Sequence, residues 1–141
     1  MKKRTAFVSA ASAAALAVLP LAGTASAATY TVTYPSGPHE GDRCTEAPRC
    51  SGSTSFVRDG DHLLIWDNAA DGHSVVVLYE RSDLGYRTVW NHYGKYHRLD
   101  VNMNLPESGW ISYKVCLGEY GSGEILEYTC SPYNWESANW E

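Results

Sequence analysis

After its first 27 residues the sequence has no long apolar run, whereas a membrane-spanning helix needs about 20 mostly apolar residues in succession. The one apolar stretch, Ala6–Leu21, follows the basic residues Lys2–Arg4 and precedes the small-residue motif Ala25–Ala27. A basic start, a short apolar segment and a small-x-small motif are the successive parts of a secretory signal peptide. We therefore expect residues 1–27 to be cleaved on secretion, which leaves a soluble extracellular chain of 114 residues out of 141.

Positive charge is scarce in this expected mature chain. The signal holds three cations and no acidic residue, so the remainder has 8 Lys and Arg against 16 Asp and Glu, a formal charge of −8 with histidine neutral. An acidic surface of this kind repels phosphate backbones and anionic membranes. The charge therefore disfavours nucleic acids and membranes as partners and is compatible with a basic protein partner.

No segment shows the 3.6-residue period of an amphipathic helix over three turns. Instead, short runs of β-branched and aromatic residues alternate with Gly, Pro, Asn and Asp, which is typical of all-β sandwiches and small barrels. We expect strands over residues 28–35, 53–58, 62–67, 73–80, 85–93, 98–105, 110–120 and 124–132. The sequence therefore predicts an all-β fold, a single small antiparallel β-sandwich of seven or eight strands with two disulfides.

The chain is expected to have three parts. Residues 1–27 are the signal peptide, and residues 28–52 hold an N-terminal strand and a disulfide-bearing linker. Residues 53–141 form the β-sandwich domain with an aromatic C-terminal tail. A mature chain of 114 residues has the usual length of one domain.

Four cysteines lie in the mature part, and an even number in an exported chain indicates disulfides. Three connectivities are possible, and proximity in sequence favours Cys44–Cys50 and Cys116–Cys130. A zinc site is disfavoured because no C-x-x-C spacing is present.

One conflict accompanies this pairing. If residues 124–132 form one regular strand, the Cys116–Cys130 bond places Leu126 on the face opposite Ile111. A bulge near Gly118, or a different disulfide partner, would remove the conflict.

The segment WDNAADGHSVVV, residues 66–77, resembles a calcium loop only in part. Asp67, Asp71 and Gly72 match three positions of an EF-hand loop, but its third and twelfth positions hold no ligand. We interpret the segment as the turn of a β-hairpin, in which Gly72 adopts a positive φ and neighbouring polar side chains accept hydrogen bonds from turn amides. An acid–base pair of Asp67 with His73 across the hairpin is the alternative.

Catalytic motifs are also missing. The histidines follow no metal-ligand spacing, and no serine lies in a G-x-S-x-G context. Glu80, Arg81, His92 and His97 are the parts available for a small exported nuclease, but their spacing fits no known arrangement and the negative charge opposes a polyanionic substrate. We therefore predict a protein that is not an enzyme, with no catalytic residue, no metal ligand and no cofactor.

Aromatic residues are unusually frequent at both ends of the mature chain. Tyr133, Trp135 and Trp140 fall in the polar tail SPYNWESANWE, a composition typical of surfaces that contact proteins or sugars. Folding of the tail back as an edge strand that buries these rings is the alternative.

The N-terminal segment ATYTVTYP alternates strictly, with Tyr30, Val32 and Tyr34 on one face. Such a strand either completes the sandwich or adds to the edge of a partner's sheet.

The stretch DGDHLLIWDNAADGHSVVV, residues 59–77, resembles a segment of small secreted actinobacterial β-sandwich proteins, most of which have no assigned activity. The layout of signal peptide, single β-domain and disulfides is also similar to that of adaptor subunits in secreted antibacterial toxin particles. The resemblance implies binding to another secreted protein, and it carries over no site residue.

We therefore predict a secreted, non-catalytic protein-binding module, an adaptor or structural subunit of a secreted toxin-like complex. The predicted partner-binding residues are Tyr30, Val32, Tyr34, Tyr133, Trp135 and Trp140. A carbohydrate-binding module using Trp135 and Trp140 is the first alternative. A small enzyme or toxin, and a protease inhibitor presenting the loop of residues 44–50, are the others.

Overall fold

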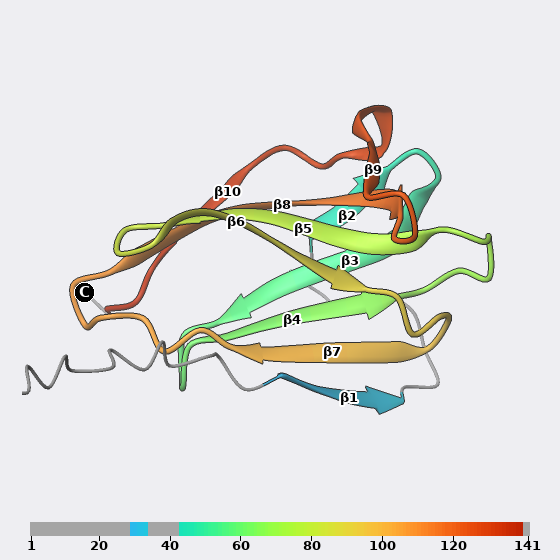
Figure 1. Cartoon of the computed structure of the whole chain (residues 1–141). Helices are drawn as coiled ribbons and strands as arrows, with labels where there is room; N and C mark the ends of the chain where they lie inside the picture. Colours follow the sequence, from blue (N-terminus) through green and yellow to red (C-terminus); the bar gives the residue numbers. More distant parts are fainter. Residues whose placement is uncertain (1–28, 34–42, 140–141) are drawn as a thin grey trace, which may run out of the picture.

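A computed structural model describes the backbone of residues 29–33 and the whole of residues 43–139 (Figure 1). Those residues form ten strands and one 3₁₀ turn, η1, over Glu127–Thr129. The strands are β1 (Thr29–Thr33), β2 (Arg43–Glu46), β3 (Arg49–Val57), β4 (His62–Asp67), β5 (Ser74–Arg81), β6 (Gly85–Asn91), β7 (His97–Asn102), β8 (Trp110–Glu119), β9 (Glu124–Leu126) and β10 (Asn134–Ser137). In the described residues no helix is long and apolar enough to cross a bilayer.

The strands form two antiparallel sheets that pack face to face, which confirms the predicted all-β sandwich (Figure 1). Sheet A has the order β1-β7-β4-β3-β2, and sheet B has the order β10-β8-β5-β6. Strand β9 pairs with Leu117–Glu119 of β8, and β10 pairs with the opposite end of the same strand. The strand number exceeds the expected seven or eight because part of the linker forms β2 and part of the tail forms β10.

Alternating side chains of the two sheets fill the core between them. Sheet A contributes Leu63, Ile65, Leu99 and Val101, and sheet B contributes Val75, Val77, Ile111, Val115 and Leu117, all buried. Close approach of the sheets requires a glycine at position 52, since a Cβ there would lie 2.7 Å from both Val75 methyl groups.

Residues 68–73 form a turn with the expected positive φ and side-chain hydrogen bond, but the turn connects strands of different sheets. Gly72 has φ +85°, and the His73 N–H donates to Asp71 Oδ1 at 3.0 Å. The expected hairpin is wrong, because β4 belongs to sheet A and β5 to sheet B. Both strands are apolar on both faces, so the local pattern could not indicate which neighbours they pair with.

The two predicted disulfides, Cys44–Cys50 and Cys116–Cys130, are both present. The expected strand over residues 124–132 is wrong beyond Leu126, where η1 begins. This 3₁₀ turn breaks the alternation of side chains, so neither a bulge nor another disulfide partner is needed.

Two hydroxyl groups replace strand pairing along this part of β8. Thr129 Oγ1 accepts from the Leu117 N–H at 2.8 Å, and Ser131 Oγ accepts from the Val115 N–H at 3.1 Å. The edge of β8 therefore keeps its hydrogen bonds between β9 and β10.

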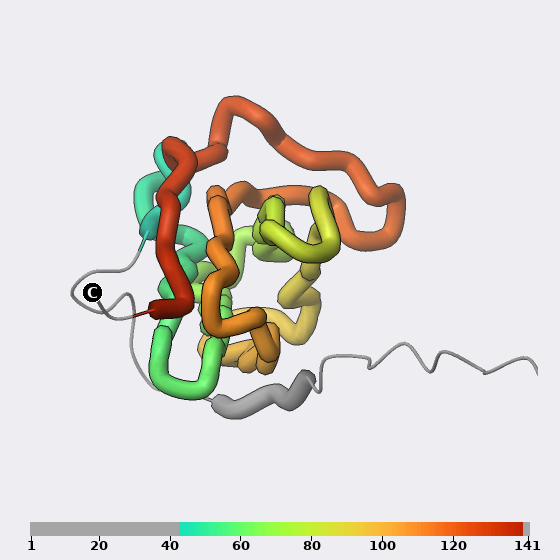
Figure 2. The backbone as a smooth tube through the Cα atoms, turned by 90° about the vertical axis from the view of Figure 1, so that its left-hand side faces the viewer, coloured from blue at the N-terminus to red at the C-terminus, as the bar shows by residue number. Residues whose placement is uncertain are grey.

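Both the N-terminal strand and the C-terminal tail take part in the sheets. The backbone of β1 pairs with β7, from Thr29 opposite Val101 to Thr33 opposite His97. The tail folds back as β10 and passes along one side of the sandwich, beside the β2–β3 hairpin (Figure 2).

Candidate binding surface

The outer face of sheet B, which points away from the core, carries a group of exposed aromatic rings. Tyr86 on β6 is 70% exposed, Trp135 on β10 is 60% exposed, and Tyr133 just before β10 is 54% exposed. We call the surface made by these rings and the outward side chains between them the aromatic face. Its members are Leu78, Glu80, Tyr86, Thr88, Ser112, Lys114, Tyr133 and Trp135.

Strand register places four of these residues in one row across the sheet. Trp135 lies opposite Ser112, Ser112 opposite Glu80, and Glu80 opposite Tyr86. Neighbouring strands are about 4.8 Å apart, so the row spans about 14 Å from Trp135 to Tyr86. The neighbours of these residues along each strand point into the core, as Ile111 and Tyr113 do on β8.

Inward contacts of β10 hold Trp135 in its exposed position. Asn134 Nδ2 donates to the Tyr113 hydroxyl at 3.0 Å, and Arg43 donates to the Asn134 side chain. On the other side of Trp135, Glu136 forms an ion pair with Arg58 at 2.6 Å. The tail is thus fixed to both sheets, while the indole between these anchors remains exposed.

A second row contains a cation that is already paired. Lys114 lies opposite Leu78, and its Nζ is 5.2 Å from the centre of the Tyr133 ring. The same Nζ lies 3.2 Å from Glu127 Oε2. Lys114 is therefore directed toward Tyr133 and η1.

Glu80 is the carboxylate of the first row. A hydrogen bond from the Tyr86 hydroxyl to Glu80, and then the negative charge of Glu80, raise the pKa of Tyr86. Within residues 43–139 no Lys, Arg or His side chain forms an ion pair with Glu80. The aromatic face thus contains a partly buried acid that no cation of residues 43–139 pairs with.

A further group of rings lies at the other end of sheet B. His92 stacks on Tyr120 with ring centres 3.9 Å apart and planes 4° apart, and on Tyr93 at 4.5 Å. Trp90 meets Tyr120 edge to face at 5.9 Å. These rings contact one another and join the β6–β7 loop to the β8–β9 hairpin.

Comparison with known proteins adds no identification. No protein-family model, no curated protein and no solved structure matches the chain.

The structure brings together only some of the predicted partner-binding residues. Tyr133 and Trp135 are adjacent and exposed, although the tail is an edge strand. The side chains of Tyr30 and Val32, and the whole of Tyr34 and Trp140, lie outside the described residues.

Sequence reasoning missed the contribution of Tyr86 and Glu80 to this surface. The alternation of Tyr86, Thr88 and Trp90 on β6 was the available signal, but the order β10-β8-β5-β6 is needed to place Tyr86 in line with Trp135.

The parts considered for a nuclease are spread over the molecule. Arg81 is buried, pairs with Asp83 at 2.7 Å and donates to the Met103 carbonyl at 2.6 Å, whereas Glu80 points outward. His92 follows β6 at the end far from Glu80, about 20 Å along the sheet. Among the described residues no group of three or more His, Cys, Asp or Glu side chains is placed to hold a metal ion.

The suggested acid–base pair of Asp67 with His73 is also not formed. His73 Nδ1 instead lies 2.5 Å from Glu119 Oε1. Asp67 is 2% exposed, and its Oδ1 accepts from the Ala69 N–H at 3.2 Å. Burial raises the pKa of Asp67 to about 6, and the Ala69 N–H partly opposes this effect.

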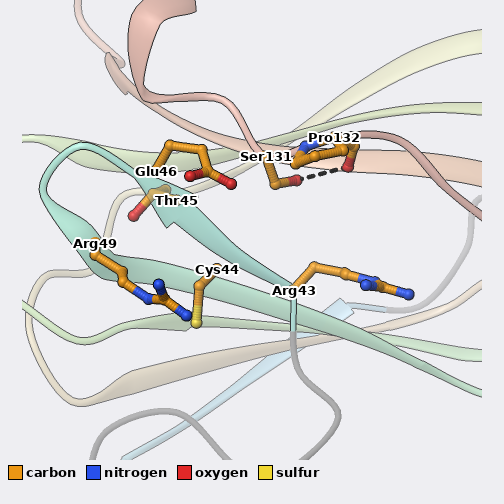
Figure 3. A pocket seen from close by; sticks show the side chains of 7 residues that line it. All are labelled: Arg43, Cys44, Thr45, Glu46, Arg49, Ser131 and Pro132. Atoms are coloured by element: carbon orange, nitrogen blue, oxygen red, sulfur yellow. Dashed lines mark hydrogen bonds between the residues drawn. The ribbon is translucent and has the colours of Figure 1, made fainter.

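A shallow depression of about 270 Å³ lies beside the Cys44–Cys50 hairpin (Figure 3). Both hydroxyl groups that line it are already bonded: Thr45 Oγ1 donates to the Pro48 carbonyl at 2.9 Å, and Ser131 Oγ donates to the Pro132 carbonyl at 2.9 Å. Arg43 points away from Arg49 and binds Asn134. The groups around the depression therefore do not converge on one point, as a ligand site would require.

Proposed function

We propose that the protein is a secreted, non-catalytic binding module that contacts another protein through the aromatic face of sheet B. The observation that carries the proposal is the presence of three rings, each more than half exposed, on one face: Tyr86, Tyr133 and Trp135. Tyr and Trp are the residue types that most often supply binding energy at protein interfaces.

The shape of the surface favours a protein partner. The aromatic face is the outside of four neighbouring strands of sheet B, β10, β8, β5 and β6, with Leu78 between its two ends. Protein interfaces combine such aromatic and aliphatic centres with a polar rim, and here Thr88 and Lys114 lie in the same row as Leu78. An adaptor or structural subunit of a secreted complex is the role this proposal favours.

Affinity purification of the tagged protein from the culture medium of the producing organism, followed by mass spectrometry, tests the proposal. We expect a defined co-secreted protein to be recovered by the parent chain and lost with Trp135→Ala. Tyr96→Ala is the matched control, because Tyr96 is an exposed ring in the β6–β7 loop, which leads into sheet A. Equal recovery with both variants would refute the proposal.

The N-terminal strand is tested separately. Because β1 pairs with β7, we propose that it completes sheet A and contributes to binding mainly by stabilising the fold. Deletion of residues 28–36 should lower the unfolding temperature. Loss of partner capture by a deletion variant of unchanged stability would instead assign binding to Tyr30, Val32 and Tyr34.

A carbohydrate is the second candidate ligand, because aromatic rings on a flat sheet also stack on the apolar faces of sugars. Binding to a glycan array that is lost with Trp135→Ala and insensitive to salt would favour this candidate.

A further inference from the structure

We propose that the aromatic face binds an arginine side chain of its partner, with the guanidinium between Glu80 and Trp135. This inference rests on the proposed function and specifies the chemistry of the partner. Three features carry it: the carboxylate of Glu80, which forms no ion pair with a described residue, the small side chain of Ser112, and the exposed indole of Trp135.

The first feature is a carboxylate that no Lys, Arg or His in the described part of the chain pairs with. Glu80 lies on β5, a central strand of sheet B, and is partly buried between its neighbours on β8 and β6. Its neighbour across the row is Tyr86, whose pKa Glu80 raises, and this neighbour leaves acceptor capacity on the two carboxylate oxygens. Partial removal from water strengthens the attraction of a carboxylate for a cation compared with a fully exposed acid.

The nearest cation on the face does not fill this role. Lys114 is directed at Glu127, 3.2 Å from its carboxylate, and at the Tyr133 ring. The contact between Lys114 and Tyr133 also shows how a cation is held on this surface, by a ring on one side and an acid on the other.

The second feature is the spacing within the row. Ser112 separates Glu80 from Trp135 and is the smallest side chain of the four. Two steps of about 4.8 Å place the backbones of Glu80 and Trp135 about 10 Å apart, so a cation above Ser112 lies about one strand spacing from the strand that carries each. One strand spacing is comparable with the roughly 6 Å within which a cation is attracted to the face of an indole ring.

The chemistry of guanidinium fits both sides of this position. A guanidinium is planar, stacks on aromatic rings and donates two parallel hydrogen bonds to a carboxylate, whereas an ammonium acts as a point charge. The acidic character of the chain, with 16 acidic and 11 basic residues in the full sequence, favours the approach of a basic partner.

A titration with a small probe tests the inference on the full mature chain. N-acetyl-arginine methylamide is added to ¹⁵N-labelled protein, and the indole N–H signal of Trp135 is followed by NMR. N-acetyl-citrulline methylamide is the control probe, because it has the same shape without the charge. We expect a saturable shift with the arginine probe, weakened by added salt, and no saturable shift with the citrulline probe.

Two variants locate the contact. Glu80→Gln should weaken binding of the arginine probe about two- to fivefold, the range for partly exposed ion pairs. Glu124→Gln is the matched control, an exposed acid on β9 away from the row, and should leave binding unchanged. Equal affinity of the parent and Glu80→Gln, or equal response to the two probes, would overturn the inference.

The experiments distinguish a failure of this inference from a failure of the proposed function. If the arginine probe fails but capture of the co-secreted protein still requires Trp135, the aromatic face binds another chemistry and only the inference is wrong. If capture is unchanged by Trp135→Ala, the proposed function is wrong whatever the probe shows.

Discussion

Replacement of Asp67 by asparagine should remove a pH dependence of stability that burial of this carboxylate creates. Asp67 ends β4 in sheet A, is 2% exposed, and has one oxygen, Oδ2, that is buried without a hydrogen-bond partner. Removal from water is the main cause that raises the pKa of Asp67 from 3.8 to about 6. The nearby Asp71 raises this pKa further, whereas the Ala69 N–H and the charges of His97 and Lys95 lower it.

Proton binding determines whether the stability of the fold rises or falls with pH. The folded state binds the proton of Asp67 more tightly than the unfolded state, so this group favours folding at low pH. Its contribution is fully present below pH 3.8 and is lost as the pH rises through about 6. The interval between these two pKa values corresponds to about 3 kcal/mol in the free energy of unfolding.

Urea unfolding followed by tryptophan fluorescence between pH 4 and 7 measures this effect. The parent should lose about 2 kcal/mol more than Asp67→Asn between pH 4 and 7, because asparagine cannot ionise and part of the full contribution of Asp67 is already lost at pH 4. The other titrating groups contribute equally to both proteins, so the difference between the two free energies of unfolding contains only the effect of Asp67. Parallel stability curves for the two proteins would refute the reasoning.

Two further predictions concern packing and hydrogen bonding. Gly52→Ala should lower the free energy of unfolding by about 1–3 kcal/mol, because the added Cβ would meet Val75 in the core. Urea unfolding measures this change. An unchanged midpoint would contradict the close packing of the two residues. Thr129→Val should cost about 1–3 kcal/mol by leaving the buried Leu117 N–H without an acceptor. Thr88→Val, at an exposed position on β6, is the matched control, and an equal loss in both variants would contradict the role of the Thr129 hydroxyl.

Much of the architecture could be predicted because its signals are local. The alternation in His97–Asn102 and Trp110–Glu119, and the proximity of each cysteine pair, indicated strands and disulfides that the structure contains. Asp71 and Gly72 likewise form a turn with the expected hydrogen bond and positive φ, although this turn connects the two sheets and not the strands of a hairpin.

The remaining features depend on contacts between distant segments. Strand β10 is short and polar, and its hydrogen-bond partners and anchors on β8, Arg43 and Arg58 are remote in sequence. Without β8 beside the tail, the alternation of its residues does not indicate which side chains point to the core and which point to solvent. The 3₁₀ turn after Leu126 was hidden for a similar reason, because Thr129 and Ser131 bond to β8 through their hydroxyl groups.

The candidate surface combines both kinds of information. Sequence composition indicated Tyr133 and Trp135 as contact residues, and both are exposed. Tyr86 and Glu80 join them only through the pairing of β6 with β5 and of β5 with β8. No pattern within a single segment predicts such a row across four strands.

Position-specific photo-cross-linking tests most directly whether sheet B presents the recognition surface. A photoreactive p-benzoylphenylalanine is introduced by Tyr86→p-benzoylphenylalanine in one variant and by Tyr96→p-benzoylphenylalanine in another, and each is irradiated in the producer's culture medium. The first should form one cross-linked species with a co-secreted protein, and the second should form none. Cross-linking from position 96 alone, or from neither position, would contradict the assignment of binding to the aromatic face.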